Sequence, residues 1–302
     1  MAVLSLTRTA NDDQRDNFTY ITVAIERQTV KMAPTSSGRV LFMQNRLPSP
    51  LLLIVSALLT ACTSQLPSDG SYNRFMRLAG DLEKRGDATT AASLYEKAAQ
   101  EPGSHLDAWL KLGETRLASD DARGAERAYQ QALELKPGAP DALLGLGTAL
   151  VRLGKLDRAV TTLTQAADTG NQPEAWNRLG IAQILRGHAQ DAQVAFNKSL
   201  TLAPNDLDTV CNLALTYALG GQNQQALEEI HSVSQSPRAQ PRHQRNELLI
   251  TVLAGRERDV AGMALEDIPA ADRKALLVEA RRIKAINDPV VQARELGLVS
   301  SH

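Results

Sequence analysis

The chain has 302 residues, of which 43% are apolar, 22% are charged and 4% are aromatic. The low aromatic content, with alanine and leucine throughout, favours helices and argues against a β-sandwich or a β-barrel. The 33 basic and 34 acidic side chains nearly cancel. Because no basic excess is available to neutralise phosphates, we expect no nucleic-acid partner.

The first 42 residues are polar and mixed, and they show neither a helical nor a strand period. They precede a segment, 43–61, that has the features of a secretory signal and should therefore stand at the N-terminus of the translated chain. We expect translation to begin at Met43, with Met32 a weaker choice, and residues 1–42 to result from a mis-assigned start. If residues 1–42 are translated, we expect them to be disordered.

Segment 43–61 predicts a signal peptide. A start that contains Arg46 is followed by an apolar run at 51–59. Nine apolar residues match the signal core of about 7–15 residues and fall short of the about 20 needed to span a membrane.

The residues Leu-Thr-Ala-Cys that end at Cys62 resemble the lipobox of bacterial lipoproteins. That resemblance implies cleavage before Cys62 and acylation of Cys62, with several acyl chains giving a stable anchor. Thr63 in place of Asp implies sorting to the outer membrane, facing the periplasm. We expect residues 62–71 to form a flexible tether.

Residues 72–240 contain an internal repeat. Leu-Gly or Leu-Ala pairs recur at Leu112, Leu146, Leu179 and Leu213, with spacings of 34, 33 and 34 residues. A helical alanine recurs in the same phase, followed four residues later by a large apolar residue; these pairs are Ala91 and Tyr95, Ala125 and Tyr129, Ala159 and Leu163, Ala192 and Phe196, and Ala226 and Ile230.

This pattern matches the tetratricopeptide repeat, a pair of antiparallel helices of about 34 residues. We place five repeats at 72–105, 106–139, 140–172, 173–206 and 207–240. Turn residues within each repeat, such as Gly86, Gly154 and Gly187, suit the left-handed backbone that follows a helix end. The predicted fold is therefore all-α, a superhelical solenoid with a concave and a convex face.

After residue 240 the repeat weakens. Asn246, Leu249, Leu253 and Gly255 repeat the phase of the previous unit, so 241–265 predicts a degenerate sixth repeat. The helix-forming stretch 270–286 predicts a cap over the exposed end of the solenoid. We expect 287–302 to be a loose tail.

No catalytic constellation is present in the sequence. We find no nucleophile elbow, no zinc-protease motif, no phosphate-binding loop and no dinucleotide fingerprint. The glycines Gly145 and Gly147 occupy the small-residue part of the repeat, where packing explains them. Two cysteines, Cys62 and Cys211, are too few for a four-cysteine metal site. Together with the missing catalytic motifs, this leads us to expect no enzyme activity, cofactor, metal or small-molecule substrate.

Function should therefore lie in a surface. In tetratricopeptide repeats the first helices line the concave groove, which holds a partner peptide or helix. The positions that point into it are, in this chain, Met76, Asp107, Leu110, Glu114, Asp141, Leu144, Thr148, Asn177, Ile181, Asp208 and Cys211. We expect an apolar floor with an acidic edge, which suits an apolar partner segment with basic flanks. For Cys211, a small buried apolar residue is the simpler interpretation.

The clamp that some family members use for a C-terminal carboxylate is missing, although Arg77, Lys111 and Arg178 lie nearby. The chain also resembles a narrower group, the TadD lipoproteins of the Flp/Tad pilus assembly system, over roughly 62–290. The residues that carry this resemblance are the stretches from Gly80, Asn212, Asn246 and Ala264.

The TadD resemblance implies a role in localising or assembling the pilus secretin at the outer membrane. Two alternatives stay open: a general envelope scaffold for peptidoglycan enzymes or another pilus pilotin, and a soluble cytoplasmic adaptor if the signal is not used.

Overall fold

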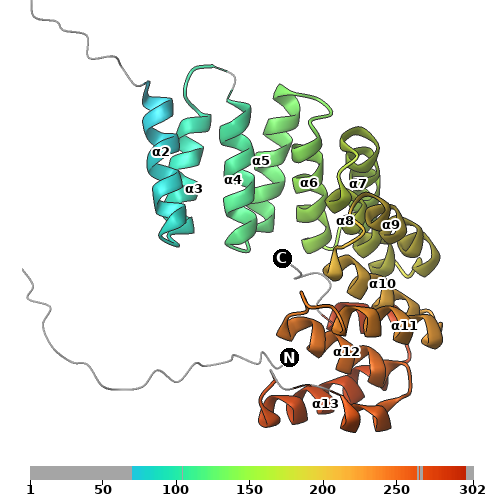
Figure 1. The fold of residues 1–302 in the computed structure, drawn as a ribbon. Helices are drawn as coiled ribbons and strands as arrows, with labels where there is room; N and C mark the ends of the chain where they lie inside the picture. Colours follow the sequence, from blue (N-terminus) through green and yellow to red (C-terminus); the bar gives the residue numbers. More distant parts are fainter. Residues whose placement is uncertain (1–69, 104, 264, 266–267, 297–302) are drawn as a thin grey trace, which may run out of the picture. The chain divides into compact units, whose positions relative to one another are not determined.

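The computed structural model describes residues 70–103, 105–263, 265 and 268–296. These residues belong to one unit of the chain, Gln65–His302. The predictions for residues 1–42, for the signal at 43–61 and for Cys62 lie outside the described residues. Within the unit, the chain forms helices that follow one another as antiparallel pairs (Figure 1).

Each of the first five pairs consists of a first helix and a second helix joined by a short turn. The pairs are α2 (Ser71–Lys84) with α3 (Ala88–Ala99), α4 (Leu106–Ala118) with α5 (Ala122–Leu135), α6 (Pro140–Arg152) with α7 (Leu156–Gly170), α8 (Pro173–Leu185) with α9 (Ala189–Leu202), and α10 (Leu207–Leu219) with α11 (Asn223–Ser234). Each helix packs against the helices before and after it in sequence. The predicted all-α tetratricopeptide solenoid is confirmed.

The turns inside the repeats use the left-handed backbone that the sequence predicts. A residue with positive φ stands between the two helices of every pair: Gly86 (82°), Asp120 (61°), Gly154 (69°), Gly187 (84°) and Gly221 (76°). Asp87 and Asp121 then cap the following helices by accepting hydrogen bonds from the backbone N–H of Thr90 (3.1 Å) and Gly124 (2.8 Å). These turn residues thus fix where the first helix of a repeat ends and the second begins.

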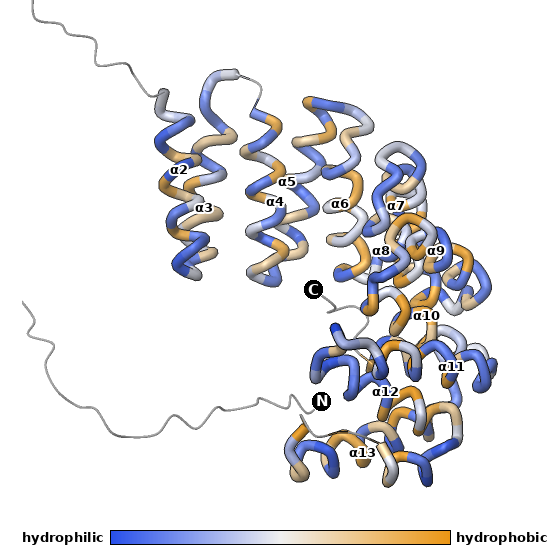
Figure 2. The backbone as a smooth tube through the Cα atoms, viewed as in Figure 1, coloured by the Kyte–Doolittle hydropathy of each residue, from blue (hydrophilic) through white to orange (hydrophobic). Residues whose placement is uncertain are grey.

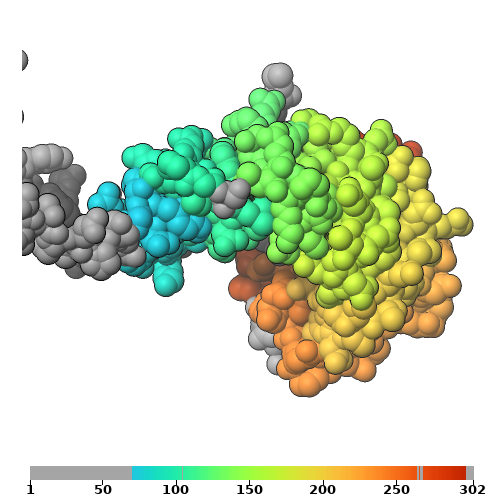
Figure 3. Space-filling view, turned by 90° about the horizontal axis from the view of Figure 1, so that it is seen from above, coloured from blue at the N-terminus to red at the C-terminus, as the bar shows by residue number. Residues whose placement is uncertain are grey.

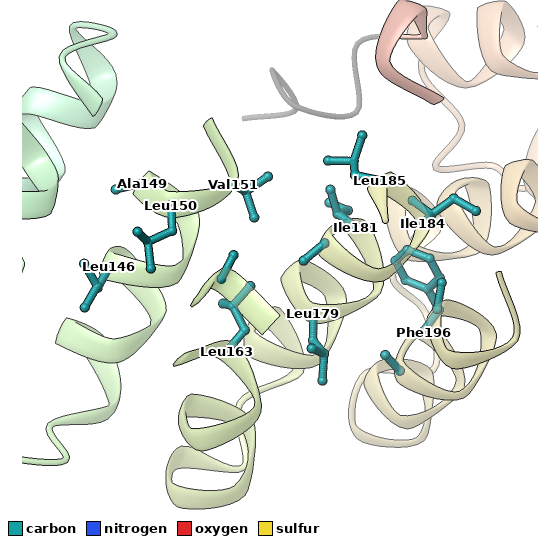
Figure 4. Close-up of a cluster of buried hydrophobic side chains, with 14 of the residues drawn as sticks. Leu146, Ala149, Leu150, Val151, Leu163, Leu179, Ile181, Ile184, Leu185 and Phe196 are labelled. Atoms are coloured by element: carbon teal, nitrogen blue, oxygen red, sulfur yellow. The ribbon is translucent and has the colours of Figure 1, made fainter. Parts of the chain in front are cut away.

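The core is divided among the repeats, and Figure 2 accordingly shows apolar residues along all the helices. The repeated alanines of the second helices are fully buried, which lets each second helix approach its neighbours closely. The large residues four positions later fill the remaining space, and all of them, Tyr95, Tyr129, Leu163, Phe196 and Ile230, are at most 3% exposed. Figure 4 shows Leu163 and Phe196 among the leucines and isoleucines of α6 and α8.

Close approach also explains the glycines of α4 and α6. A Cβ at Gly113 would stand 2.6 Å from the ring of Tyr129, and a Cβ at Gly145 would overlap the same ring. A Cβ at Gly147 would overlap the side chain of Leu163. The packing interpretation of Gly145 and Gly147 therefore agrees with their surroundings, because each glycine faces a large side chain of a second helix.

The C-terminal part departs from the repeat. The first helix of the sixth unit is α12 (Pro241–Leu253), but a short 3₁₀ helix, η1 (Glu257–Gly262), follows where a second helix would begin. The longer α13 (Ala270–Lys284) packs against α12 instead. The expectation of a loose tail after 286 is wrong for part of that segment, because α14 (Pro289–Glu295) is a helix packed against α8 and α10.

Candidate protein-binding groove

The first helices of the repeats form one continuous face. α4 contacts α6, α6 contacts α8, α8 contacts α10 and α10 contacts α12, so the first helices from α4 to α12 lie side by side. Their second helices cover them from the other side. We call the remaining side of α2, α4, α6, α8 and α10 the groove face. Figure 3 shows the surfaces of successive repeats following one another in chain order.

The groove face of α2, α4 and α6 carries half-buried apolar side chains between exposed acids. Met76, Leu110 and Leu144 are partly buried, and Met76 and Leu110 lie at the edge of the clusters beneath them. Of the predicted groove residues here, Asp107, Glu114 and Asp141 are exposed, while Thr148 is half-buried. Half-buried apolar side chains thus lie beside exposed carboxylates on α4 and α6, and their role in partner binding stays a prediction.

Lys111 and Arg178 are each paired with an acid of the same helix. The Nζ atom of Lys111 lies 2.6 Å from Oε2 of Glu114, and Nε of Arg178 lies 2.7 Å from Oε1 of Glu174. The hydrogen bond with Glu114 raises the pKa of Lys111 and so keeps it charged. The charge of Lys111 therefore offsets that of Glu114.

Asp208 is exposed, but it is engaged within the chain. Its two carboxylate oxygens accept hydrogen bonds from Nε and the terminal nitrogen of Arg242, each at 2.9 Å, and Nε2 of His243 lies 3.0 Å from Oδ1. Because Nδ1 of His243 accepts the backbone N–H of Gln240, the proton of the neutral ring resides on Nε2. The hydrogen bond from Arg242 lowers the pKa of Asp208, and the group ties α10 to α12.

Three predicted groove residues are corrected by their burial. Asn177, Ile181 and Cys211 are only 6%, 1% and 3% exposed, so they are closed to a partner in this structure. Asn177 donates a hydrogen bond to the hydroxyl of Thr209 and thereby joins α8 to α10. Ile181 shares a cluster with Ala293 of α14, which contacts α8, and Cys211 lies in a cluster with Ile250 of α12. The physical reason is therefore that elements later in the chain cover these positions.

Cys211 is the free cysteine of the described residues, and it is buried. Burial raises the pKa of its thiol to about 12, so the thiol stays protonated and unreactive at neutral pH. The simpler interpretation from the sequence, a small buried apolar residue, fits this environment.

The helix α14 occupies part of the groove face and is absent from the sequence prediction. Its local signals are present: Asp288 and Pro289 form a helix start, and Val290, Ala293 and Leu296 recur every third residue. The carboxylate of Asp288 accepts the backbone N–H of Val290 at 2.8 Å. What the sequence does not give is the position of this helix on α8 and α10.

Within the described residues, no group of three or more His, Cys, Asp or Glu side chains could hold a metal ion. None of the helices in that part of the chain is long and apolar enough to span a membrane.

The helix pairs, the left-handed turns and the single face of first helices define a tetratricopeptide-repeat protein, a class of scaffolds that bind protein partners. The chain belongs to the family described as the cilia and flagella-associated protein 70 C-terminal domain (CFAP70_TPR_C), which it matches over residues 59–287.

Curated relatives are longer proteins. The peroxisomal targeting signal receptor of Candida albicans is 30% identical over 111 residues, which is 33% of this chain and 19% of the receptor. The cellulose synthase operon protein C of Pseudomonas fluorescens is 26% identical over 217 residues, 69% of this chain and 17% of that protein. The chain thus spans less than a fifth of the length of these relatives.

Solved structures share the fold at low identity. PilW, described as a widely conserved type IV pilus biogenesis factor, has a TM-score of 0.57 and 21% identity, covering 63% of this chain and 89% of its own. Pseudomonas aeruginosa PilF has a TM-score of 0.54 and 18% identity, covering 76% and 97%. A tetratricopeptide repeat protein of Parabacteroides merdae has a TM-score of 0.57 and 17% identity, covering 76% and 99%.

Proposed function

We propose that this chain is a non-catalytic, lipid-anchored adaptor of the bacterial envelope that binds the secretin of a Flp/Tad pilus. The observation that carries the binding part is the groove face of α2, α4 and α6, where Leu110 and Leu144 stand between exposed acids. Such a surface suits a partner segment with apolar side chains and basic flanks. The pilus part is supported by the TadD resemblance and by the fold shared with PilW and PilF.

The anchor in this proposal is Cys62. The lipobox that ends at Cys62 supports acylation, and residues 62–71 would then join the lipid to the repeats. The test is expression from Met43 in a Gram-negative host with a palmitate analogue as label. We expect the native chain to incorporate label and to fractionate with the outer membrane, and Cys62→Ser to do neither. Equal fractionation of the two chains would refute the anchor.

The binding test is capture of the secretin from detergent-solubilised membranes by the tagged native chain, identified by mass spectrometry. The groove variant is Leu110→Asp with Leu144→Asp, since both side chains are only partly buried. Ile181 is unsuitable because an aspartate at this 1% exposed position would disrupt the core.

The matched control is Val194→Asp with Leu202→Asp, which places the same two charges at positions of the second helix α9 that are 60% and 38% exposed. We expect the control to capture the secretin as the native chain does and the groove variant to lose capture while melting cooperatively. Capture of peptidoglycan enzymes without secretin would instead support the general envelope scaffold.

A further inference from the structure

The segment after α13 returns to the groove face. α14 contacts α8 and α10, which are both first helices, in addition to the neighbouring α13. A methyl group of Val290 lies 3.0 Å from the place a Cβ would take at Gly187, at the end of α8. Ala293 is fully buried in the cluster that contains Ile181, and Leu296 packs at its edge. In Figure 4 the short red helix is drawn beside the end of α8 that carries Leu185.

The covered positions are those that earlier repeats leave open. Glu114, Thr148 and Ile181 hold equivalent places in three successive first helices, at spacings of 34 and 33 residues. Glu114 is exposed, Thr148 is half-buried and Ile181 is 1% exposed. The groove face therefore has an open part on α2, α4 and α6 and a part on α8 and α10 that is already occupied by a helix of this chain.

The helix α14 is helical because it is docked on α8 and α10. α14 has seven residues, whereas an isolated helix shorter than about 12–15 residues is marginal in water. Gln292 donates hydrogen bonds to the carbonyls of Ile283 (3.1 Å) and Ile286 (2.8 Å), and Arg282 pairs with Glu295 at 2.5 Å. Release from α8 and α10 would leave α14 with only these contacts to α13 and the turn after it, and a helix this short would then be marginal.

We propose that α14 is an internal competitor for the groove face, so that a partner helix reaches α8 and α10 only when α14 leaves. The occupant indicates what the partner presents there: a short helix with small or aliphatic residues three apart, like Val290, Ala293 and Leu296. This inference rests on the proposed function, because it concerns the same groove. It adds that the groove has a closed and an open state.

The first test uses hydrogen exchange of the full chain without a partner. Ala293→Glu places a charge at the buried face of α14, and Val291→Glu places the same charge at a 37% exposed position of the same helix. With α14 docked in the native chain, we expect Ala293→Glu to speed exchange of the α14 amides about tenfold or more and to leave the core of α4 and α6 unchanged. Val291→Glu should stay near the native rate. Equal rates in both variants would overturn the docking.

The second test is secretin capture by the same three chains. If α14 is undocked in about 1–10% of native molecules, releasing it from all of them should raise the apparent affinity for the secretin about ten- to a hundredfold. We therefore expect tighter capture by Ala293→Glu than by Val291→Glu, and faster exchange of α14 when secretin binds the native chain. Unchanged capture by Ala293→Glu, with α14 released, would overturn the competition and leave α14 a structural cap.

The two proposals fail differently. If only the competition by α14 is refuted, the native chain still captures the secretin, and Leu110→Asp with Leu144→Asp still abolishes that capture. Absence of secretin capture by all chains, including Ala293→Glu, refutes the proposed partner, and the exchange measurement still reports whether α14 is docked.

Discussion

At the scale of single residues, the repeat depends on glycines and alanines that make room for one large neighbour each. The ring of Tyr129 lies against both Gly113 of α4 and Gly145 of α6. Tyr129 therefore joins two repeats, and its surroundings leave no volume for an added methyl group. A glycine without such a neighbour has the opposite role, since in a helix it only lowers stability.

Gly145→Ala and Gly80→Ala separate these two roles. A Cβ at Gly145 overlaps the Tyr129 ring, whereas a Cβ at Gly80 has its nearest neighbour, the Tyr95 hydroxyl, at 3.7 Å. We expect Gly145→Ala to destabilise the fold by about 1–3 kcal/mol through overpacking. Gly80→Ala should stabilise α2 by up to about 1 kcal/mol. Thermal and urea unfolding measure both; stabilisation by both variants would contradict the close packing of Tyr129.

Glu126 provides a pH-dependent link between repeats. Its carboxylate, 8% exposed, lies 2.6 Å from Nζ of Lys155 and 3.1 Å from a guanidinium nitrogen of Arg158. Burial alone would raise the pKa of Glu126, but the hydrogen bonds and charges of Lys155 and Arg158 hold it below the ordinary value. The link therefore stabilises the fold fully above the unfolded pKa of about 4.3 and is lost as the pH falls through the lower folded pKa.

We expect Glu126→Gln to lower the free energy of unfolding by about 1 kcal/mol at pH 7, since Lys155 and Arg158 remain partly hydrated. The difference in the free energy of unfolding between the native chain and Glu126→Gln should shrink below pH 4. Urea unfolding at pH 7 and pH 3 measures it, with Glu134→Gln, an exposed position of the same helix, as the control. An equal difference at both pH values would show that the effect is not ionic.

At the scale of elements, the sequence predicts what is local and periodic. The turns at Gly86 and Gly255 and the buried Ala159 and Phe196 follow from residues at fixed offsets, and each has the expected backbone or burial. The burial of Ile181 could not be predicted in this way, because it depends on α14, which comes from far along the chain and packs against α8. Nor could the place of α14, which contacts a helix about a hundred residues earlier in the chain.

The end of the array is closed by α13 rather than by a regular second helix. Ile283 is 2% exposed and Ala280 is fully buried, and α13 packs against α12. In a solenoid each unit is stabilised by its neighbours, so weakening the last helix should affect the adjacent units most. We therefore expect α13 to act as an energetic cap of the array.

Ile283→Ala tests the cap. We expect a loss of about 2–4 kcal/mol for a buried isoleucine, and faster amide exchange in α12 and α13 than in α4 and α6. Val278→Ala, at a 57% exposed position of the same helix, should cost less than about 0.5 kcal/mol. Exchange that rises uniformly along the array would show that the repeats unfold as one cooperative unit, with no local role for α13.

At the scale of the whole described unit, the groove face combines a half-buried apolar floor with exposed acids. Asp107 and Asp141 are exposed on α4 and α6, while Asp208 is held by Arg242 and His243. Exposed charges at the edge of an interface mainly set the association rate and its salt dependence. A partner with basic flanks should therefore bind this chain faster at low ionic strength.

Asp107→Asn with Asp141→Asn tests the acidic edge without changing side-chain size. We expect the association rate with the proposed secretin partner to fall about 3- to 10-fold at low salt, because steering by two charges is lost. The association rates of the native chain and this variant should become more similar near 0.5 M salt, where the Debye length is a few ångströms. The control, Asp168→Asn with Glu134→Gln, removes two exposed acids from the second helices α7 and α5. If the control slows association as much as the groove variant, steering arises from total charge, and the acidic edge has no directing role.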